Sequence, residues 1–357
     1  MTVAPYRILS ADWLTNTIRE ELPIQDLRWS KVLDAQGAMS GWINLDHRKA
    51  TRANLDPGAT LIYIERGGVL VWGGILWTAR PDTEGRKLQL GAEGFWSYFR
   101  RRRIRTTKTF TGIDQLAIAR DLIQYANAQP GALPGITVGA ETSGVPRDRI
   151  YYAYERKWLG EAIEELAAVI GGFDFDIDVT WDAAGTTPVR TFRLFYPRKG
   201  TRIDGLVFNH NVAGVARYSA DVDATKIANL VDALGQGDGD AMLVATAADP
   251  AQWARYPLLE DVISHKDVNV ADTLQGHAAA SVERRKLPVE TASLAKRADI
   301  WPDLGSFDVG DEGRLVVEDG WVSVNGFQRI QAIEVTVSDE GDEQLVPTFV
   351  SADASVD

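Results

Sequence analysis

The sequence predicts an α+β protein that is mainly β, built from two related small β-barrels with an α/β region inserted between them. Two β-hairpins of one design, at residues 55–80 and 307–337, predict the two barrels. Short apolar runs separated by Gly, Pro, Asn and Asp predict strands through residues 1–105. Amphipathic helical patterns lie between residues 111 and 286, which places the helices in the interior of the chain.

The two hairpins share the same order of residue types. Each has an Asp-x-Gly bend, a strand, a tight turn that contains glycine, and a return strand. The bends lie at Asp56-Pro57-Gly58 and Asp308-Val309-Gly310, and the turns lie at Gly67-Gly68 and Asp319-Gly320. Aspartate bonds the backbone that follows it and glycine tolerates positive φ, so both residues suit a bend that feeds a strand. We therefore expect the two segments to superpose as equivalent hairpins.

The first barrel is predicted to span residues 1–108, and an inserted α+β domain is predicted to span residues 109–220. Thr111 is expected to cap the first helix of the insertion, with Asp114 in its first turn. Its apolar face is formed by Ile113, Leu116, Ile123 and Ala126. A second helix is predicted from about Trp158 to Ile170, and Gly171-Gly172 ends it.

A strand follows the second helix, because residues 173–181 alternate apolar side chains with Asp174, Asp176 and Asp178. Residues 192–197 are its predicted partner. Three arginines are expected to lie opposite the aspartates and to offset their repulsion: Arg190, Arg193 and Arg198. The acidic face is predicted to be solvated. Its spacing also resembles the start of a calcium loop, but the loop glycine and the distal glutamate are missing.

The remaining chain is divided into a strand-rich segment with a helix at 221–290, a second barrel at 291–350 and a flexible tail at 351–357. The segment Gly237-Asp238-Gly239-Asp240 predicts a hairpin tip, with cation binding as the alternative. A third helix is predicted from Ala271 to Lys286. Its apolar positions recur every four residues, at Val270, Leu274, Ala278 and Val282.

Composition indicates a globular protein without metal or disulfide chemistry. The chain has 357 residues, which suggests two or three domains, and 45% of them are hydrophobic. It has no cysteine, and its four histidines show no paired spacing, so neither a zinc site nor a cofactor is predicted. No nucleophile elbow marks a catalytic residue, and we expect no enzyme activity. Neither a secretion leader nor a membrane span is predicted.

A basic segment stands out from this acidic chain, whose net charge is −12. It consists of Arg100, Arg101, Arg102, Arg103, Arg105 and Lys108. The charge of the whole chain opposes general nucleic-acid binding. The basic segment is therefore predicted to contact acidic groups on a neighbouring subunit, and contact with DNA passing through a channel is the alternative. A third reading is a strand whose arginines alternate between solvent and a barrel rim.

Several short segments of the sequence resemble segments of the minor tail proteins of long-tailed phages. Near the N-terminus they are the run at 27–34, the strand at 42–45 and Leu70-Val71-Trp72-Gly73-Gly74-Ile75. Near the C-terminus they are Tyr256–Glu260, the helix opening at 271–274, Gly310-Asp311 and Arg329-Ile330. Those tail proteins are similar in fold to the baseplate hubs of contractile phage tails and to the hubs of related injection machines.

The resemblance implies a structural hub at the phage tail tip. A homotrimer would place six barrels in a ring, matching a sixfold tail tube or distal tail protein above and a threefold central fibre or other tip proteins below. The protein would be made in the host cytoplasm, would reside in the virion, and would contact genomic DNA only transiently during its passage. The alternatives are a tail-associated cell-wall hydrolase and a tip protein that binds receptor carbohydrate.

Overall fold

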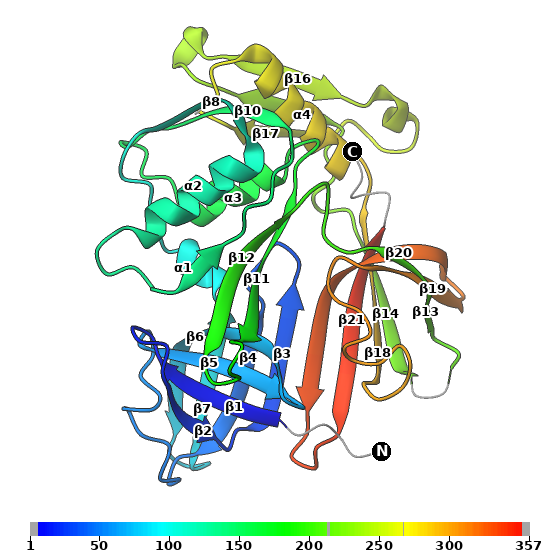
Figure 1. Cartoon of the computed structure of the whole chain (residues 1–357). Coiled ribbons are helices and arrows are strands. Elements are labelled where there is room, and N and C mark those ends of the chain that lie inside the picture. The colour runs from blue at the N-terminus through cyan, green and yellow to red at the C-terminus, as the bar shows by residue number, and fades with distance from the viewer. Residues whose placement is uncertain (1–5, 213–214, 267, 352–357) are drawn as a thin grey trace.

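The computed structural model describes residues 6–212, 215–266 and 268–351. Its main element is a sheet of 13 strands that contains both ends of the described chain. Figure 1 shows a lobe of N-terminal strands beside a lobe of C-terminal strands, with the helices gathered above the N-terminal lobe. The protein is α+β and mainly β, as the sequence predicts.

The N-terminal lobe, here called the N-lobe, is antiparallel throughout. Its strands are β1 (Tyr6–Asp12), β2 (Ile18–Leu22), β3 (Gln25–Val32), β4 (Ala38–Asn44), β5 (Thr60–Arg66), β6 (Val69–Asp82) and β7 (Lys87–Gly94). The β5–β6 turn consists of Gly67 at φ 57° and Gly68 at φ 87°. Two successive positive φ angles match the right-handed twist of the strands, which explains why two glycines stand there. The first predicted hairpin is confirmed.

The C-terminal lobe, here called the C-lobe, contains the second predicted hairpin. Its strands are β13 (Arg202–Asn209), β14 (Val215–Asp223), β18 (Val289–Arg297), β19 (Glu312–Asp319), β20 (Val322–Val337) and β21 (Glu343–Ser351). β19 and β20 pair antiparallel across a turn at Gly320, whose φ is 59°. This hairpin lies in the same sheet as β5–β6. The predicted flexible tail begins at Ser351, the last residue of β21, and residues 352–357 lie outside the described residues.

The two lobes are joined by pairing between β3 and β20. The register is antiparallel and runs from Leu27 opposite Val337 to Val32 opposite Ala332. One hydrophobic core lies behind this joint and contains Trp29 of the N-lobe and Phe349 of the C-lobe. Because burial of apolar surface stabilises both lobes through this shared core, they pack as one body.

The insert, residues 108–195, covers the other face of the N-lobe together with a short helix that precedes it. Its elements are β8 (Lys108–Asp114), α2 (Gln115–Asn127), β9 (Ile136–Val138), β10 (Pro146–Tyr151), α3 (Leu159–Ala167), β11 (Asp174–Trp181) and β12 (Pro188–Phe195). The preceding helix is α1 (Trp96–Phe99). Its Trp96 ring lies 4.4 Å from that of Phe175 on β11, so α1 links the core of the insert to the N-lobe.

The start of the first long helix differs from the prediction. Residues 108–114 form strand β8, which pairs with β10, and Asp114 rather than Thr111 caps α2. The Asp114 carboxylate accepts hydrogen bonds from the backbone amides of Leu116 at 2.8 Å and Ala117 at 3.3 Å. Those amides lack partners within the helix, so aspartate one residue before it is the stronger cap. The second helix ends at Ala167 with Ala168 as its cap, three residues before the predicted end at Ile170, and Gly171 with φ 64° lies in the turn that follows.

A small distal unit lies above the insert in Figure 1. It consists of β15 (Leu230–Leu234), β16 (Val244–Ala248), β17 (Glu260–Ser264) and α4 (Ala271–Arg285), with 3-10 turns at Gly239–Ala241 and Pro250–Ala254. The predicted tip at residues 237–240 connects the paired strands β15 and β16, so it is a hairpin connection. Leu274, Ala278 and Val282 of α4 are buried, as predicted, whereas the fourth predicted position, Val270, is the exposed cap residue before the helix.

Candidate functional site

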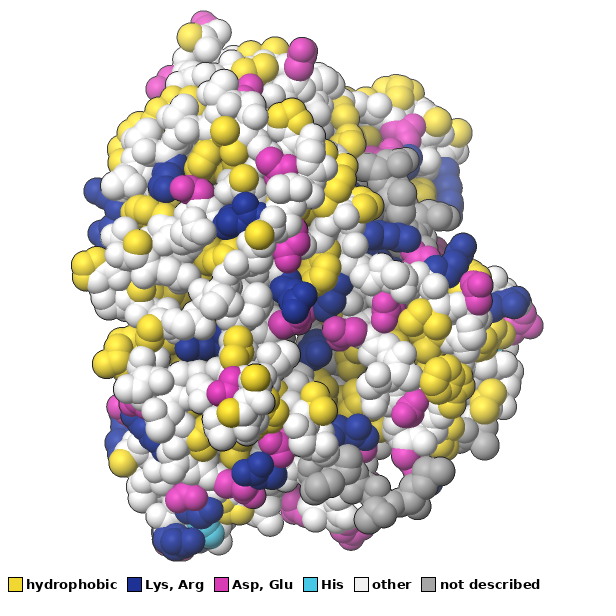
Figure 2. All heavy atoms as spheres, viewed as in Figure 1, with side chains coloured by type: hydrophobic (Ala, Val, Ile, Leu, Met, Phe, Trp, Pro, Cys, Tyr) yellow, Lys and Arg dark blue, Asp and Glu magenta, His cyan; other side chains and the backbone are white. Residues whose placement is uncertain are grey.

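The acidic strand β11 reaches the point where the two lobes and the insert meet. Figure 1 shows β11 and β12 extending from the insert toward the lobes. Basic and acidic side chains lie side by side near the centre of this face of the space-filling surface (Figure 2). Where β11 meets the two lobes, a cluster of charged residues forms what we call the junction; it consists of Lys31, Asp34, Asp174, Asp176, Lys199, Asp308 and Arg329.

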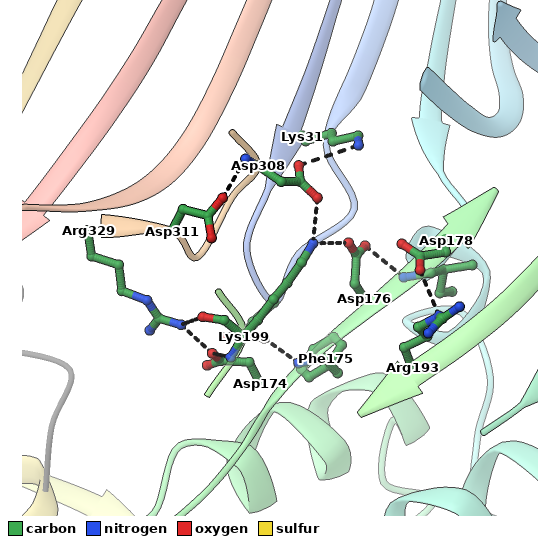
Figure 3. A network of polar contacts seen from close by, with 12 residues as sticks. Lys31, Asp174, Phe175, Asp176, Asp178, Arg193, Lys199, Asp308, Asp311 and Arg329 are labelled. Carbon is green, nitrogen blue, oxygen red and sulfur yellow. Dashed lines mark hydrogen bonds and ion pairs between the residues drawn. The ribbon is translucent and has the colours of Figure 1, made fainter. Parts of the chain in front are cut away.

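Lys199, in the connection from β12 to β13, is the centre of the junction (Figure 3). Its side chain is 9% exposed, and its Nζ donates hydrogen bonds to Asp176 at 2.6 Å and to Asp308 at 3.0 Å. Lys31 of β3 lies 3.4 Å from the same Asp308 carboxylate. Charge-assisted hydrogen bonds of this kind are stronger than neutral ones. The Lys199 ammonium group therefore links the insert to the C-lobe, and the ion pair between Asp308 and Lys31 links the C-lobe to the N-lobe.

Arg329 of β20 forms the second tie. Its guanidinium donates to the carboxylate of Asp174, to the carbonyl oxygen of Lys199 at 3.0 Å and to that of Gly310 at 3.3 Å. Arg329 and Asp174 are both buried. The Asp34 carboxylate of the N-lobe accepts the backbone N–H of Phe175 at 2.7 Å and lies beside Asp174. β11 is thus held by contacts with both the C-lobe and the N-lobe.

The electrostatics of the junction follow from burial and from the nearest charges. Burial, and after it the neighbouring Asp174 carboxylate, raise the pKa of Asp34 well above its usual range. Burial alone would also raise the pKa of Asp308, but Lys31 and Lys199 outweigh it and hold that pKa below its ordinary value. Burial opposes the charge on Lys199, yet Asp176 and Asp308 raise the pKa of its ammonium group. The cluster therefore contains one carboxyl group that resists ionisation.

Replacing Asp34 with asparagine is expected to stabilise the protein near neutral pH. The folded state binds a proton at Asp34 more tightly than the unfolded state, so stability falls as pH rises from about 3.9 through the raised pKa. Asparagine cannot ionise and keeps an oxygen for the Phe175 amide. The gain in unfolding temperature over the wild type should shrink toward about pH 4.

Asp308→Asn provides a control of opposite sign for that experiment. The lowered pKa of Asp308 contributes stability above its unfolded pKa, and this contribution is lost as pH falls. Asp308→Asn should therefore lower the unfolding temperature near neutral pH, and the loss should fade in acid. Thermal unfolding followed by circular dichroism measures both variants. A gain for Asp34→Asn that is independent of pH would contradict the assignment.

The structure corrects the prediction that the acidic face of β11 is solvated. Asp174 is buried, and Asp176 contacts Lys199 inside the junction. Arg193 lies opposite Asp176 and bonds Asp178 at 2.8 Å, as predicted. The other two arginines do not face the aspartates. Arg190 points to the buried face of β12 because side chains alternate along a strand, and Arg198 pairs with Glu312 at 2.7 Å.

The basic segment begins as a turn after α1, Arg103 forms an isolated β-bridge with Trp158, and Lys108 is the first residue of strand β8. Arg100 lies 3.3 Å from Glu164 and Arg101 lies 3.1 Å from Glu93. Lys108 pairs with Asp121 of α2. Three of the six predicted charges therefore have a carboxylate partner within the chain.

The other three charges of the basic segment are Arg102, Arg103 and Arg105, which form no ion pair within the described part of the chain. Arg102 donates to the Tyr98 hydroxyl, and the Arg103 guanidinium lies 3.3 Å from the centre of the Trp158 ring. Arg105 is exposed. The role of these cations toward a neighbouring subunit or DNA stays a prediction.

No group of three or more His, Cys, Asp or Glu side chains among the described residues could hold a metal ion. Among the helices that the structure describes, none has the length and apolar character needed to cross a membrane.

Comparison with known proteins identifies the fold. No family model matches the sequence, and no curated protein matches it. A tail protein from Neisseria meningitidis MC58 is 14% identical, with a TM-score of 0.61 and 97% of each chain covered. The 43 kDa tail protein of prophage MuSo2 from Shewanella oneidensis is 13% identical, with a TM-score of 0.63, covering 98% of this chain and 99% of that one.

The chain has the fold of phage tail proteins. A prophage tail protein from Listeria monocytogenes EGD-e supports this at 13% identity, with a TM-score of 0.55, and covers 96% of this chain and 94% of its own. The tail-protein fold extends over both lobes, the insert and the distal unit, because each alignment covers nearly the whole chain. The resemblance in fold that the sequence suggests is confirmed.

Proposed function

We propose that this protein is a structural minor tail protein that forms a homotrimeric hub at the tip of a siphovirus tail. Three copies, each with two related lobes, would present six similar units to the tail tube or distal tail protein and threefold symmetry to a central fibre or other tip proteins. In this proposal the units divide near residues 108, 220 and 290. The role is structural, and no catalytic residue is assigned.

The observation that carries this proposal is the pair of hairpins β5–β6 and β19–β20 within one continuous sheet. Both follow an Asp-x-Gly bend and both turn on glycine with positive φ. A closed ring of such subunits needs heterologous contacts, in which one surface of a copy meets a different surface of the next. In a trimer, the six similar lobes would lie about every 60° around the threefold axis. This arrangement would let the ring match a sixfold tail tube on one side and threefold tip proteins on the other.

The net charge of −12 suits a channel through which DNA slides, because an acidic wall repels phosphate groups. Arg102, Arg103 and Arg105 would then serve a neighbouring subunit rather than the genome. Reconstruction of intact virion tips by electron cryomicroscopy tests the assembly. Three copies are expected around the tail axis, and one or six copies would contradict the hub. A monomer in dilute solution does not count against it, since weak rings dissociate on dilution.

The double change Arg101→Glu with Arg103→Glu is expected to reduce the yield of assembled particles. Charge reversal would place like charges against an acidic neighbour, which is unfavourable. Arg105→Glu reverses one charge of the same segment and serves as a comparison for the double change. The Arg105 side chain is exposed, and its replacement breaks no ion pair within the described chain. Circular dichroism of each isolated protein should match the wild type. Normal particle yield with poor DNA ejection would instead favour a DNA contact, and normal results in both assays would leave the segment as a solvated surface.

A further inference from the structure

A cleft separates the insert from the distal unit. Its volume is about 390 Å³, and β10 with the turn after α3 forms one wall while the first turns of α4 form the other. A smaller hollow of about 220 Å³ shares Asp148, Arg149 and Thr273 with it. The cleft has the size of a small-molecule site.

Two arginines of β10, Arg147 and Arg149, line this cleft, and two exposed carboxylates, Asp148 and Asp272, line it as well. Arg149 is 5% exposed, and one guanidinium nitrogen donates to the carbonyl oxygen of Asp148 at 2.8 Å. Arg147 donates to Gln115 at 3.2 Å and to the carbonyl oxygen of Ile170 at 2.6 Å. Within the described residues neither arginine forms an ion pair. A buried guanidinium without a counter-ion is unfavourable, because its charge has left water without compensation.

His277 of α4 also lines the cleft and is 7% exposed. Its Nε2 has no hydrogen-bond partner in the described part of the chain. Its ring stacks on His265 at 4.0 Å between centroids. Burial, and then His265 and Arg149, lower the pKa of His277 to about 3, so the ring is neutral near neutral pH. A neutral imidazole can donate one hydrogen bond from a ring nitrogen.

The N-terminus of α4 completes the wall. Val270 occupies the cap position and supplies no side-chain hydrogen bond to the amides of the first turn. An uncapped helix N-terminus presents free N–H groups and a partial positive charge. The two carboxylates of the cleft lining are both exposed: Asp148 accepts the Gly112 amide at 2.6 Å, and Asp272 lies in the first turn of α4. Neither forms an ion pair with Arg149.

We propose that this cleft binds a small oxyanion, a phosphate or a carboxylate, between Arg149 and the first turn of α4. The anion would compensate the buried guanidinium and would receive hydrogen bonds from Thr273 or His277. Because its ligands come from both walls, the bound anion would fasten the distal unit to the insert. The two sources of such an anion are a free phosphate ion and a carboxylate supplied by an acidic segment of a neighbouring protein.

Thermal unfolding and phosphorus NMR of the full chain test this site. Inorganic phosphate, at ionic strength matched with sodium chloride, should raise the unfolding temperature in a saturable manner and broaden the phosphate resonance. Succinate is the parallel probe for a carboxylate. A response to phosphate alone favours the free ion, and a response to succinate alone favours a protein carboxylate. No saturable response to either probe overturns the proposal.

Three variants separate binding from general salt effects. Arg149→Met should weaken the response at least tenfold and should not lower the unfolding temperature in chloride, since it removes an uncompensated buried charge. Thr273→Val keeps the side-chain volume and should also weaken the response. Arg190→Met is the control: Arg190 is 1% exposed, has two unpartnered guanidinium nitrogens among the described contacts, and does not line this cleft. A response that survives in Arg149→Met, or that is lost equally in Arg190→Met, overturns the site.

Discussion

Arg329→Ala is expected to lower the free energy of unfolding by about 3–5 kcal/mol, the range for one partner removed from a buried ion pair. The change leaves the Asp174 carboxylate buried without its cation and leaves two carbonyl oxygens without their donor. It also unties β20 of the C-lobe from β11 of the insert. Chemical denaturation followed by circular dichroism and by tryptophan fluorescence measures the loss.

Arg193→Ala is the matched control for Arg329→Ala. Arg193 bonds Asp178 on the same strand β11, but its side chain is 50% exposed. An ion pair in contact with water contributes less than about 1 kcal/mol, because solvent screens it and both side chains lose entropy. The two variants should therefore differ by several-fold in their loss of stability. Equal losses of stability in the two variants would show that burial does not determine how much an ion pair of β11 contributes.

Gly200→Ala is expected to destabilise the protein by about 2–4 kcal/mol, through steric overlap and an unfavourable backbone angle. Gly200 has φ 83°, and a Cβ there would lie 2.2 Å from the carbonyl carbon of Gly310. The neighbouring atoms belong to the backbone, so neither side can yield without moving a strand connection. The contact lies where the chain leaves the insert and enters the C-lobe.

Gly205→Ala is the control for the glycine substitution. Gly205 lies in β13, and a Cβ at that position meets no heavy atom within 4 Å. Alanine there reduces the freedom of the unfolded chain, so stability should stay the same or rise slightly. Thermal unfolding of both variants separates the effect of close backbone approach from that of adding a methyl group. A loss for Gly200→Ala no larger than for Gly205→Ala would contradict this account.

Local sequence patterns predict much of the fold because they depend on neighbouring residues. The Gly67-Gly68 and Gly320 turns specify tight hairpins through positive φ, and both hairpins are present. The four-residue spacing of α4 and the alternation of β11 predict a helix and a strand at the right places. The error at α2 arose because Thr111 and Asp114 are both good caps, and only the pairing of β8 with β10 decides between them.

The junction could not be predicted, because its members are far apart in the sequence. Asp174 and Arg329 meet only when the insert packs on the C-lobe, and no spacing along the chain relates them. The Asp-x-Gly pattern predicts a bend at Asp308, which explains its position but not its ion pair with Lys199. The acidic face of β11 is the one feature of the sequence that indicates the junction. Three aspartates on one face of a strand repel one another unless cations from elsewhere in the chain, or solvent, compensate them, and the sequence alone favours solvent.

The pairing of β3 with β20 has a consequence for synthesis of the protein on the ribosome. β3 lies among the first strands to leave the exit tunnel, yet its second partner is encoded near the end of the chain. Until translation reaches Val337, the β3 edge presents unpaired amide and carbonyl groups, and Trp29 lacks the C-lobe part of its core. Such an edge attracts chaperones and proteases. A nascent or truncated chain is thereby distinguishable from a finished one, because only the finished chain covers this edge.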